Sequence, residues 1–280
     1  MGKKVIIIGG GVAGMQTAIT LSKLGISPVI IEREETIGGK LNRWDRLFPT
    51  MTPASEVLGS LREQVDASGA EILTSREVKE IGQEGKNVTL NDGTRLRSDA
   101  VVVTSGFDLF PAELKEEYGY KIYDNVYTTV DVERMFRNGG IRTADGRIPK
   151  TIAFLHCVGS RDEKVCQAHC SRVCCITGVK QAMELKEMFP AADVFNFYMD
   201  IRMFGPGYEE MYREAQQRYN IHFLRGRISE ASPTIDGRVQ IKAEDTLTGR
   251  PLRMSVDMLV LIVGMRANDD NEAFAAGAGL

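Results

Sequence analysis

The sequence predicts an α/β protein built from two Rossmann-type units. Two patterns lead to this fold class: a glycine-rich turn between a strand and a helix near the start, and a similar order of strands and helices after residue 150. The composition, 43% hydrophobic and 26% charged in 280 residues, is ordinary for a soluble protein and fits one large or two medium domains. We expect a first domain over residues 1–115, a second over 116–264 and the start of a return to the first over 265–280.

Charge and hydropathy exclude several classes of protein. A net charge of −3 and a pI of about 5.8 offer no basic surface for nucleic acid. The longest apolar runs, "VIII" and "MLVLIV", have the length of strands, so no membrane span is expected. The start "MGKKVIIIGGG" lacks the apolar core of an export signal, and we therefore expect a cytoplasmic protein.

The first unit begins with a short apolar strand followed by "GGGVAG". Gly9, Gly11 and Gly14 fit the spacing G-x-G-x-x-G, in which glycines permit a tight turn, close approach of a pyrophosphate and close packing of helix on strand. The helix that starts here offers unpaired N–H groups to phosphates, which adds Val12 and Ala13 to the candidate site.

A second strand, "PVIIIE", ends at Glu32. In a dinucleotide-binding unit an acidic residue about 20 positions after the glycines bonds a ribose hydroxyl, and Glu32 stands close to that position. The alternative is a glycine-rich turn with an unrelated surface glutamate. That alternative does not account for the order of strand, glycines, helix, strand and acid.

The stretch "REETIGGKLN" resembles the extension found in flavoproteins with two dinucleotide-binding domains. The resemblance implies that Gly39 lets the backbone approach a flavin nucleotide, that Arg33 flanks the adenosine, and that Lys40 and Leu41 lie toward the isoalloxazine. FAD is therefore favoured over NAD, although a solvated loop lysine explains Lys40 equally well. The same resemblance implies that the strand containing Val78 contacts the adenine. It also implies contacts from Thr104 and Gly106, in a loop where these flavoproteins usually carry Ala-Thr-Gly. Here a serine is inserted between the threonine and the glycine.

The second unit begins with a strand at 151–156, but the expected glycine-rich loop does not follow it. A helix is expected over 172–189, then a strand, a helix at about 207–219 and a last strand, "VDMLVLIVG". All five cysteines lie between Cys157 and Cys175, where a phosphate loop would be. We therefore expect this unit to have lost pyridine-nucleotide binding and gained a metal site.

The cysteine spacing favours an iron–sulfur cluster. Zinc sites usually draw on pairs of cysteines separated by two residues, and redox disulfides use the same C-x-x-C spacing. This spacing does not occur here. A cubane cluster takes four thiolates and tolerates irregular spacing, so [4Fe–4S] fits better than zinc or a vicinal disulfide. We expect three sulfurs within one turn at the start of the helix and the fourth at the end of the strand. The expected ligands are Cys170, Cys174, Cys175 and Cys157.

Other residues near the cysteines have more ordinary interpretations. Cys166 lies outside the four expected ligands, and three interpretations stay open for it: a replacement for one of the four, a free thiol, or a sulfur that faces the substrate. His156 and His169 flank expected ligands, and packing or an ordinary hydrogen bond explains them better than ligation. An ordinary ion pair that ties the loop to the strand explains Arg161, Asp200 and Arg202 at least as well as a functional role. No catalytic acid or base is assigned.

Five segments carry a resemblance to a known family: "AFLHCVGSRDE", "CSRVCC", "GVKQAMELKE", "YMDIRMFGPGYEEMYREAQ" and "FLRG". They closely resemble the flavoproteins that form the A subunits of heterodisulfide reductases, which combine a thioredoxin-reductase-like FAD fold with a C-x12-C-x3-C-C iron–sulfur site. The region "RWDRLFPTMTPASEVL" has no cysteine where longer members carry an added cluster site. The chain therefore looks most like the compact A subunit of the heterodisulfide-reductase-like complex of sulfur oxidisers. It stops at "AAGAGL", before the family's last flavin-contacting segment.

The resemblance implies an electron-transfer oxidoreductase subunit with FAD and a [4Fe–4S] cluster, acting in sulfur or thiol–disulfide metabolism. Its expected partners are other subunits of such a complex or a second copy of the chain, with the sulfur or thiol substrate on a partner. Three alternatives stay open: a subunit of the quinone-interacting membrane complex, a stand-alone FAD disulfide reductase, and a cluster-bearing scaffold with a vestigial flavin site. The missing second glycine loop and the missing C-x-x-C disfavour the stand-alone reductase.

Overall fold

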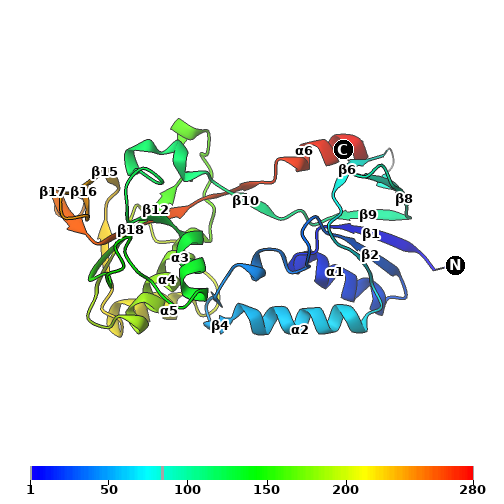
Figure 1. Cartoon of the computed structure of the whole chain (residues 1–280), viewed down its shortest axis with the longest axis horizontal. Helices are drawn as coiled ribbons and strands as arrows, with labels where there is room; N and C mark the ends of the chain where they lie inside the picture. The colour runs from blue at the N-terminus through cyan, green and yellow to red at the C-terminus, as the bar shows by residue number, and fades with distance from the viewer. Residues whose placement is uncertain (1, 83–84, 280) are drawn as a thin grey trace. The chain divides into compact units, whose positions relative to one another are not determined.

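The computed structural model describes residues 2–82 and 85–279, and the chain forms two compact units (Figure 1). The first unit is made of three segments: the chain up to Trp44, Thr52–Asp108, and the chain from Ala267 on. The second unit is made of Asp45–Met51 and Leu109–Arg266. The chain thus leaves the first unit at residue 108, earlier than the expected 115, and a short early segment belongs to the second unit.

A parallel sheet of four strands forms the centre of the first unit, in the order β5-β2-β1-β9. These strands are β5 (Glu71–Leu73), β2 (Ser27–Ile31), β1 (Lys4–Ile8) and β9 (Ala100–Val103). Two helices, α1 (Val12–Lys23) and α2 (Ala54–Ala67), lie on one side of this sheet (Figure 1). The order strand, glycine-rich turn, helix, strand is the one that the sequence predicts.

The other side of this sheet packs against an antiparallel sheet of β6 (Val78–Ile81), β7 (Asn87–Leu90) and β8 (Arg95–Arg97). Ile6 and Ile8 point to this side, because residues two apart on a strand share a face. They share a core with Phe274 of helix α6 (Asp270–Ala278). The last segment of the chain is therefore built into the first unit.

The second unit repeats this plan around a parallel sheet in the order β11-β18-β12-β13-β14. Alternate residues of its central strand β12 face opposite sides: Ile152 and Phe154 pack with the helices, and Ala153 and Leu155 pack with an antiparallel sheet. The parallel strands are β11 (Val126–Thr128), β12 (Thr151–Val158), β13 (Asp193–Tyr198), β14 (His222–Arg225) and β18 (Met258–Val263), and the helices are α3 (Thr129–Arg137), α4 (Cys174–Met188) and α5 (Tyr208–Gln217).

The remaining elements are short or lie on the outside of this plan. The antiparallel sheet of the second unit comprises β15 (Ile228–Pro233), β16 (Val239–Asp245) and β17 (Arg250–Val256). Two small sheets pair β3 (Arg46–Leu47) with β4 (Thr52–Pro53), and β10 (Phe107–Leu109) with β19 (Met265–Ala267). Single turns of 3-10 helix are η1 (Gly39–Asn42), η3 (Ala112–Leu114), η4 (Glu116–Tyr118) and η5 (Glu163–Val165).

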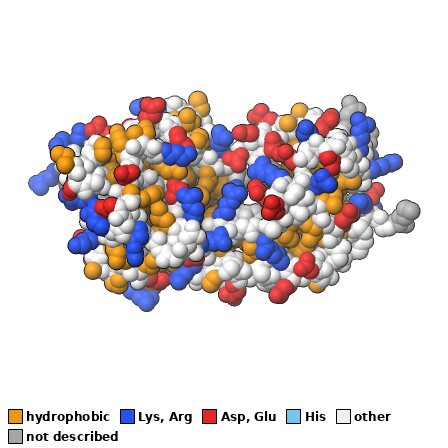
Figure 2. Space-filling view, in the orientation of Figure 1, with side chains coloured by type: hydrophobic (Ala, Val, Ile, Leu, Met, Phe, Trp, Pro, Cys, Tyr) orange, Lys and Arg blue, Asp and Glu red, His pale blue; other side chains and the backbone are white. Residues whose placement is uncertain are grey.

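The surface agrees with the composition. Acidic and basic side chains are interspersed over the visible face of each unit, as a net charge near zero implies (Figure 2). Within residues 2–82 and 85–279, no helix is both long enough and apolar enough to cross a lipid bilayer.

Candidate functional site

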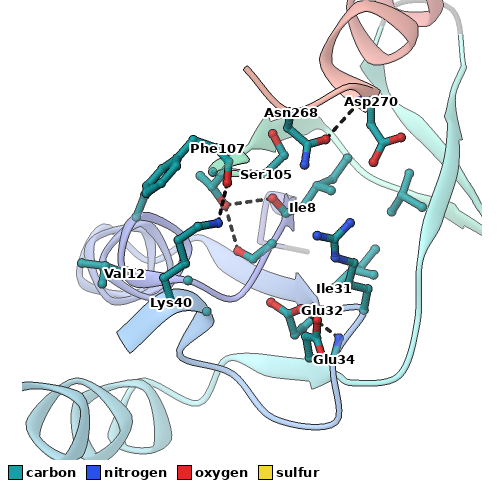
Figure 3. A pocket seen from close by; sticks show the side chains of 18 of the residues that line it. Ile8, Val12, Ile31, Glu32, Glu34, Lys40, Ser105, Phe107, Asn268 and Asp270 are labelled. Carbon is teal, nitrogen blue, oxygen red and sulfur yellow. Dashed lines mark hydrogen bonds between the residues drawn. The ribbon is translucent and has the colours of Figure 1, made fainter. Parts of the chain in front are cut away.

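A cavity of about 450 Å³ opens in the first unit at the carboxyl ends of its parallel strands. Ligands of open α/β sheets bind at this edge. Figure 3 shows Glu32 and Glu34 on one side of the cavity and Asn268 and Asp270 on another. All but one of the expected cofactor contacts line it: Gly9, Gly11, Val12, Ala13, Glu32, Arg33, Gly39, Lys40, Leu41, Val78, Thr104 and Gly106.

The glycines of the first turn have distinct geometric roles. Gly9 has a φ of 101°, in the left-handed region that favours glycine. A Cβ on Gly14 would lie 1.9 Å from the carbonyl oxygen of Gly9, so Gly14 permits the helix to pack on the turn and does not line the cavity. A Cβ on Gly11 would meet no atom within 4 Å, although Gly11 lines the cavity. The backbone at Gly11 is thus free for close approach by a ligand.

Glu32 is held in place by backbone amides. Its carboxylate accepts hydrogen bonds from the N–H of Gly10 at 2.7 Å and of Glu34 at 2.9 Å, and the side chain is only 6% exposed. Because a carboxylate has about four acceptor positions, it can still accept a hydrogen bond from a hydroxyl group on the cavity side. The position is suited to a ribose.

Lys40 is tied to the wall of the cavity rather than solvated. Its Nζ donates to the carbonyl oxygen of Phe107 and lies 4.3 Å from the centre of that aromatic ring (Figure 3). Burial lowers the pKa of Lys40, although the carboxylate of Asp108 acts in the opposite direction. The ammonium group is therefore a positioned donor in a partly buried setting.

Several cavity residues were not predicted from the sequence. Three of them lie in the last segment of the chain, which forms part of the cavity wall: Asn268, Asp270 and Phe274. The hydroxyl of Ser105 bonds the side chain of Asn271 at 2.6 Å, which holds this segment against the loop after β9. No local motif marks these residues, since only the return of the chain brings them to the cavity.

The residues around the cavity fit a flavin nucleotide. A glycine turn with open space at Gly11, the N-terminus of α1 and the buried carboxylate of Glu32 are the parts that a dinucleotide needs for its pyrophosphate and ribose. The cavity is also large enough for part of such a ligand.

In the second unit, three of the five cysteines are buried together. Cys157 lies near the end of β12, and Cys174 and Cys175 form the first turn of α4; each is 2% exposed. Cys170 is half-buried in the preceding loop, and Cys166 is exposed. All five thiols are free.

The structure corrects one expectation about these cysteines. Cys170 does not belong to the helix, which begins only at Cys174. Arg172 has a φ of 65°, a left-handed conformation that a right-handed helix cannot include. Ser171 is also held from outside the helix, since its N–H donates to the Oγ of Ser160 at 3.1 Å.

The three buried thiols interact with one another. Hydrogen bonding to Cys157 and Cys175 raises the pKa of Cys174, while hydrogen bonding from Cys174 lowers the pKa of both neighbours. The N-terminus of α4 adds a positive dipole end, which favours thiolates. These shifts favour the thiolate form at Cys157 and at Cys175.

The loop between Cys157 and Cys170 is anchored by buried polar residues that were not predicted. The carboxylate of Asp162 accepts from Lys115 at 2.8 Å and from Arg227 at 2.7 Å. Although burial acts in the opposite direction, these bonds lower the pKa of Asp162 to about 2. The loop thus has a fixed ionic anchor within the second unit.

Cys170 is fixed by its two neighbours. The Nε2 of His169 lies 3.0 Å from the carbonyl oxygen of Met265, to which it donates, and the N–H of Met265 donates to the Oγ of Ser171 at 2.8 Å. The expected ion pair is also present, with Arg161 Nη1 at 2.6 Å from Asp200 Oδ2.

Within the described residues, no three or more His, Cys, Asp or Glu side chains are arranged to hold a single metal ion. The donor chemistry nevertheless fits an iron–sulfur cluster, because thiolates are its usual ligands and three of the four expected sulfurs are neighbours. Cys170 stands four residues before Cys174, in the adjoining loop.

Comparison with known proteins supports the fold described above. Residues 3–135 match the family described as pyridine nucleotide-disulphide oxidoreductase. The fold is that of thioredoxin reductase: the Lactococcus lactis enzyme superposes with a TM-score of 0.65 at 17% identity, over 99% of this chain and 81% of that one. The T. acidophilum thioredoxin reductase gives 0.63 at 18% identity, over 99% and 82%. The predicted fold class is confirmed.

Two relatives resemble the chain over nearly all of its length. The iron-sulfur A subunit of the CoB--CoM heterodisulfide reductase of Methanocaldococcus jannaschii is 32% identical over 99% of this chain and 56% of its own. The A subunit of the H(2)/formate:CoB-CoM heterodisulfide,ferredoxin reductase of Methanococcus maripaludis is 30% identical over the same shares. The chain thus spans little more than half the length of these reductase subunits. The predicted resemblance to the A subunits of heterodisulfide reductases is confirmed over nearly the whole chain.

Proposed function

We propose that this chain is an electron-transfer subunit that binds FAD in its first unit and a [4Fe–4S] cluster in its second. It would work in the cytoplasm within a heterodisulfide-reductase-like complex of sulfur or thiol–disulfide metabolism, with the sulfur substrate on a partner subunit. The names of the relatives support this reading, since they describe reductase subunits and, in the first case, an iron-sulfur subunit.

In the first unit, the chain's own groups would bind and orient the flavin nucleotide. The N-terminus of α1 and the open backbone at Gly11 suit the pyrophosphate, and Glu32 suits the ribose. Lys40 presents an ammonium group beside Phe107. A bound flavin supplies hydride and single-electron chemistry.

The observation that carries the proposal is the burial of Cys157, near the end of β12, together with Cys174 and Cys175 at the start of α4. In a second dinucleotide-binding unit this is where a glycine-rich loop would hold a phosphate. Thiols there cannot serve that purpose, whereas a helix N-terminus favours the thiolate form, which is the form that binds iron. Cys170 is the fourth sulfur that a cubane would require.

The test is anaerobic purification with iron, sulfide and flavin measured on one sample. We expect about four irons, four sulfides and one FAD per chain, with iron lost in Cys174→Ser and flavin retained. Cys166→Ser is the matched control, because that exposed thiol lies outside the proposed ligand set. Zinc in place of iron, or a metal-free protein with intact flavin, would contradict the cluster and return the cysteines to thiol chemistry.

A further inference from the structure

A buried histidine lies beside the cysteines without a complete set of hydrogen bonds. His156 is 2% exposed, and its Nε2 lies 2.8 Å from Oδ1 of Asn196, which is fully buried. Its Nδ1 and the Nδ2 of Asn196 are buried, and neither has a hydrogen-bond partner among the described residues. Two unpaired polar atoms in one contact pair are costly, which indicates that something else normally satisfies them.

The niche for this imidazole is built into helix α4. A Cβ on Gly178 would lie 2.8 Å from Cε1 and 3.0 Å from Nε2 of His156, so any side chain there would displace the ring. Glycine inside a helix costs about 1 kcal/mol relative to alanine. Gly178 lies in the middle of α4 and is buried, and the ring of His156 explains why the helix carries it.

The sulfur of Cys175 is a group that can complete this network. Cys175 stands three residues before Gly178, on the face of α4 against which the ring packs. Although burial acts in the opposite direction, the interaction with this sulfur raises the pKa of His156. Because Asn196 occupies Nε2, the ring nitrogen left for the sulfur is Nδ1. Cys175 also faces the backbone of the strand-end segment, since its Sγ lies 3.6 Å from the carbonyl oxygen of Asp200.

The choice of tautomer follows from counting donors. An amide can turn either its oxygen or its nitrogen toward the ring. If Asn196 presents its oxygen, Nε2 carries the proton and Nδ1 has no hydrogen to give. If it presents its nitrogen, that N–H donates to Nε2, and Nδ1–H becomes a donor aimed at Cys175. The second arrangement pairs both atoms that lack partners and leaves only an amide oxygen unpaired, a commoner condition than an unpaired N–H.

We propose that His156, oriented by Asn196 in the space left by Gly178, donates an Nδ1–H hydrogen bond to the Cys175 thiolate and thereby raises the reduction potential of the cluster that this sulfur binds. The inference rests on the proposed function, because it concerns the cluster of that proposal. Reduction adds one electron to the cluster and transfers no atom. A hydrogen bond to a ligand sulfur disperses negative charge and so favours the reduced state.

Two substitutions at His156 test the roles of its two ring nitrogens separately. The amide nitrogen of asparagine reaches about as far as Nδ1, and that of glutamine about as far as Nε2. His156→Asn therefore keeps a donor near Cys175, whereas His156→Gln keeps only the partner of Asn196. His222→Gln is the control, since His222 is exposed in β14 and stacks on Phe195.

The measurement is the midpoint potential of the cluster, followed by electron paramagnetic resonance during a redox titration. We expect His156→Gln to lower the equilibrium constant for one-electron reduction about tenfold, which is about 59 mV. His156→Asn and the control should stay near the wild type. Equal potentials in wild type and His156→Gln, with the cluster intact in both, would overturn the inference. A wild-type protein without a cluster would instead overturn the proposed function.

A second measurement covers the case in which His156→Gln fails to retain iron. With ¹⁵N-labelled histidine, the reduced wild-type cluster should show hyperfine coupling to one imidazole nitrogen. The coupling should persist in His222→Gln and weaken in Gly178→Ala, where the new methyl group displaces the ring. No coupling in the wild type would show that the imidazole does not touch the cluster sulfur, and the inference would be wrong.

Discussion

The two units share a plan but differ in the turn that follows the central strand of each sheet. The order β5-β2-β1-β9 in the first unit recurs as β14-β13-β12-β18 in the second, and each unit adds a three-stranded antiparallel sheet. The backbone turns into the left-handed region at the end of both first strands, with a φ of 101° at Gly9 and 61° at Cys157. The first turn continues with Gly10 and Gly11, whereas Cys157 is joined by Cys174 and Cys175 at the start of the following helix.

Under the proposed function, the N-terminus of a helix at the same place in the plan would serve two kinds of anion. Unpaired N–H groups and a positive dipole end would stabilise a pyrophosphate in one unit and thiolates in the other. A phosphate needs room along the backbone, which glycines provide. Thiolates are side chains of the protein itself, so the residues at that place need not be glycines.

The helices that follow these turns also differ in what they bury. Helix α1 buries Gly14, Met15, Ala18 and Ile19, which are all apolar. Helix α4 buries a charged group, in which Lys180 Nζ lies 2.6 Å from Glu133 and 2.9 Å from Glu184. Two carboxylates thus share one ammonium group inside the second unit.

The largest effect is expected from Gly14→Ala in the first unit. The new methyl group would lie 1.9 Å from the carbonyl oxygen of Gly9, so the backbone must move. We expect a loss of about 3 kcal/mol in the free energy of unfolding, as for overpacking in a core, together with loss of bound flavin. Denaturant unfolding and the flavin content after purification measure both.

Gly59→Ala is the matched control for this change. A Cβ on Gly59 would meet no atom within 4 Å, and the residue lies in α2, outside the cavity lining. This variant should be neutral or slightly more stable. Equal behaviour of the two variants would mean that α1 does not pack on the turn as described, and the comparison of the two turns would fail.

An intermediate effect is expected from Glu184→Gln in α4. Burial raises the pKa of Glu184 from 4.5 to about 7. Between these values the folded protein holds a proton that the unfolded chain releases, so the free energy of unfolding falls as pH rises through this window. The stabilisation is complete below about pH 4.5 and lost above about pH 7.

The variant should remove this pH dependence. We expect the wild type to lose about 2 kcal/mol more than Glu184→Gln between pH 5 and pH 8, measured by urea unfolding at both values. Glu187→Gln is the control, because Glu187 is 39% exposed in the same helix. Parallel pH profiles for wild type and Glu184→Gln would show that the buried group does not hold a proton.

Sequence patterns predicted the parts of this protein whose chemistry is local. The glycine turn and Glu32 follow from short-range rules, and the cysteine spacing marks its own segment. The exclusion of Cys170 from the helix was missed because it depends on the bond between Ser160 and Ser171, and on a left-handed backbone at Arg172.

The return of the last segment to the first unit was expected, but the residues that it brings to the cavity and the placement of segment 45–51 were missed, for the same physical reason. Asn268 and Asp270 reach the cavity only because the chain returns to the first unit. The segment 45–51 joins the second unit through contacts such as the N–H of Asp45 on Glu133, 88 positions away. Neither feature leaves a periodicity or a motif in the sequence.

The smallest effect is expected from Gly11→Ala, which tests the cavity without disturbing the fold. A Cβ there would meet no protein atom within 4 Å, and the φ of −72° suits alanine. The unfolding free energy of the flavin-free protein should therefore stay within about 0.5 kcal/mol of the wild type. A methyl group in the cavity should still weaken FAD binding about tenfold, or 1.4 kcal/mol, in a titration of the flavin-free protein. An unchanged affinity would mean that the pyrophosphate does not approach this glycine. The glycine turn of the first unit would then not be a pyrophosphate site, and the proposed contrast between the two turns would fail.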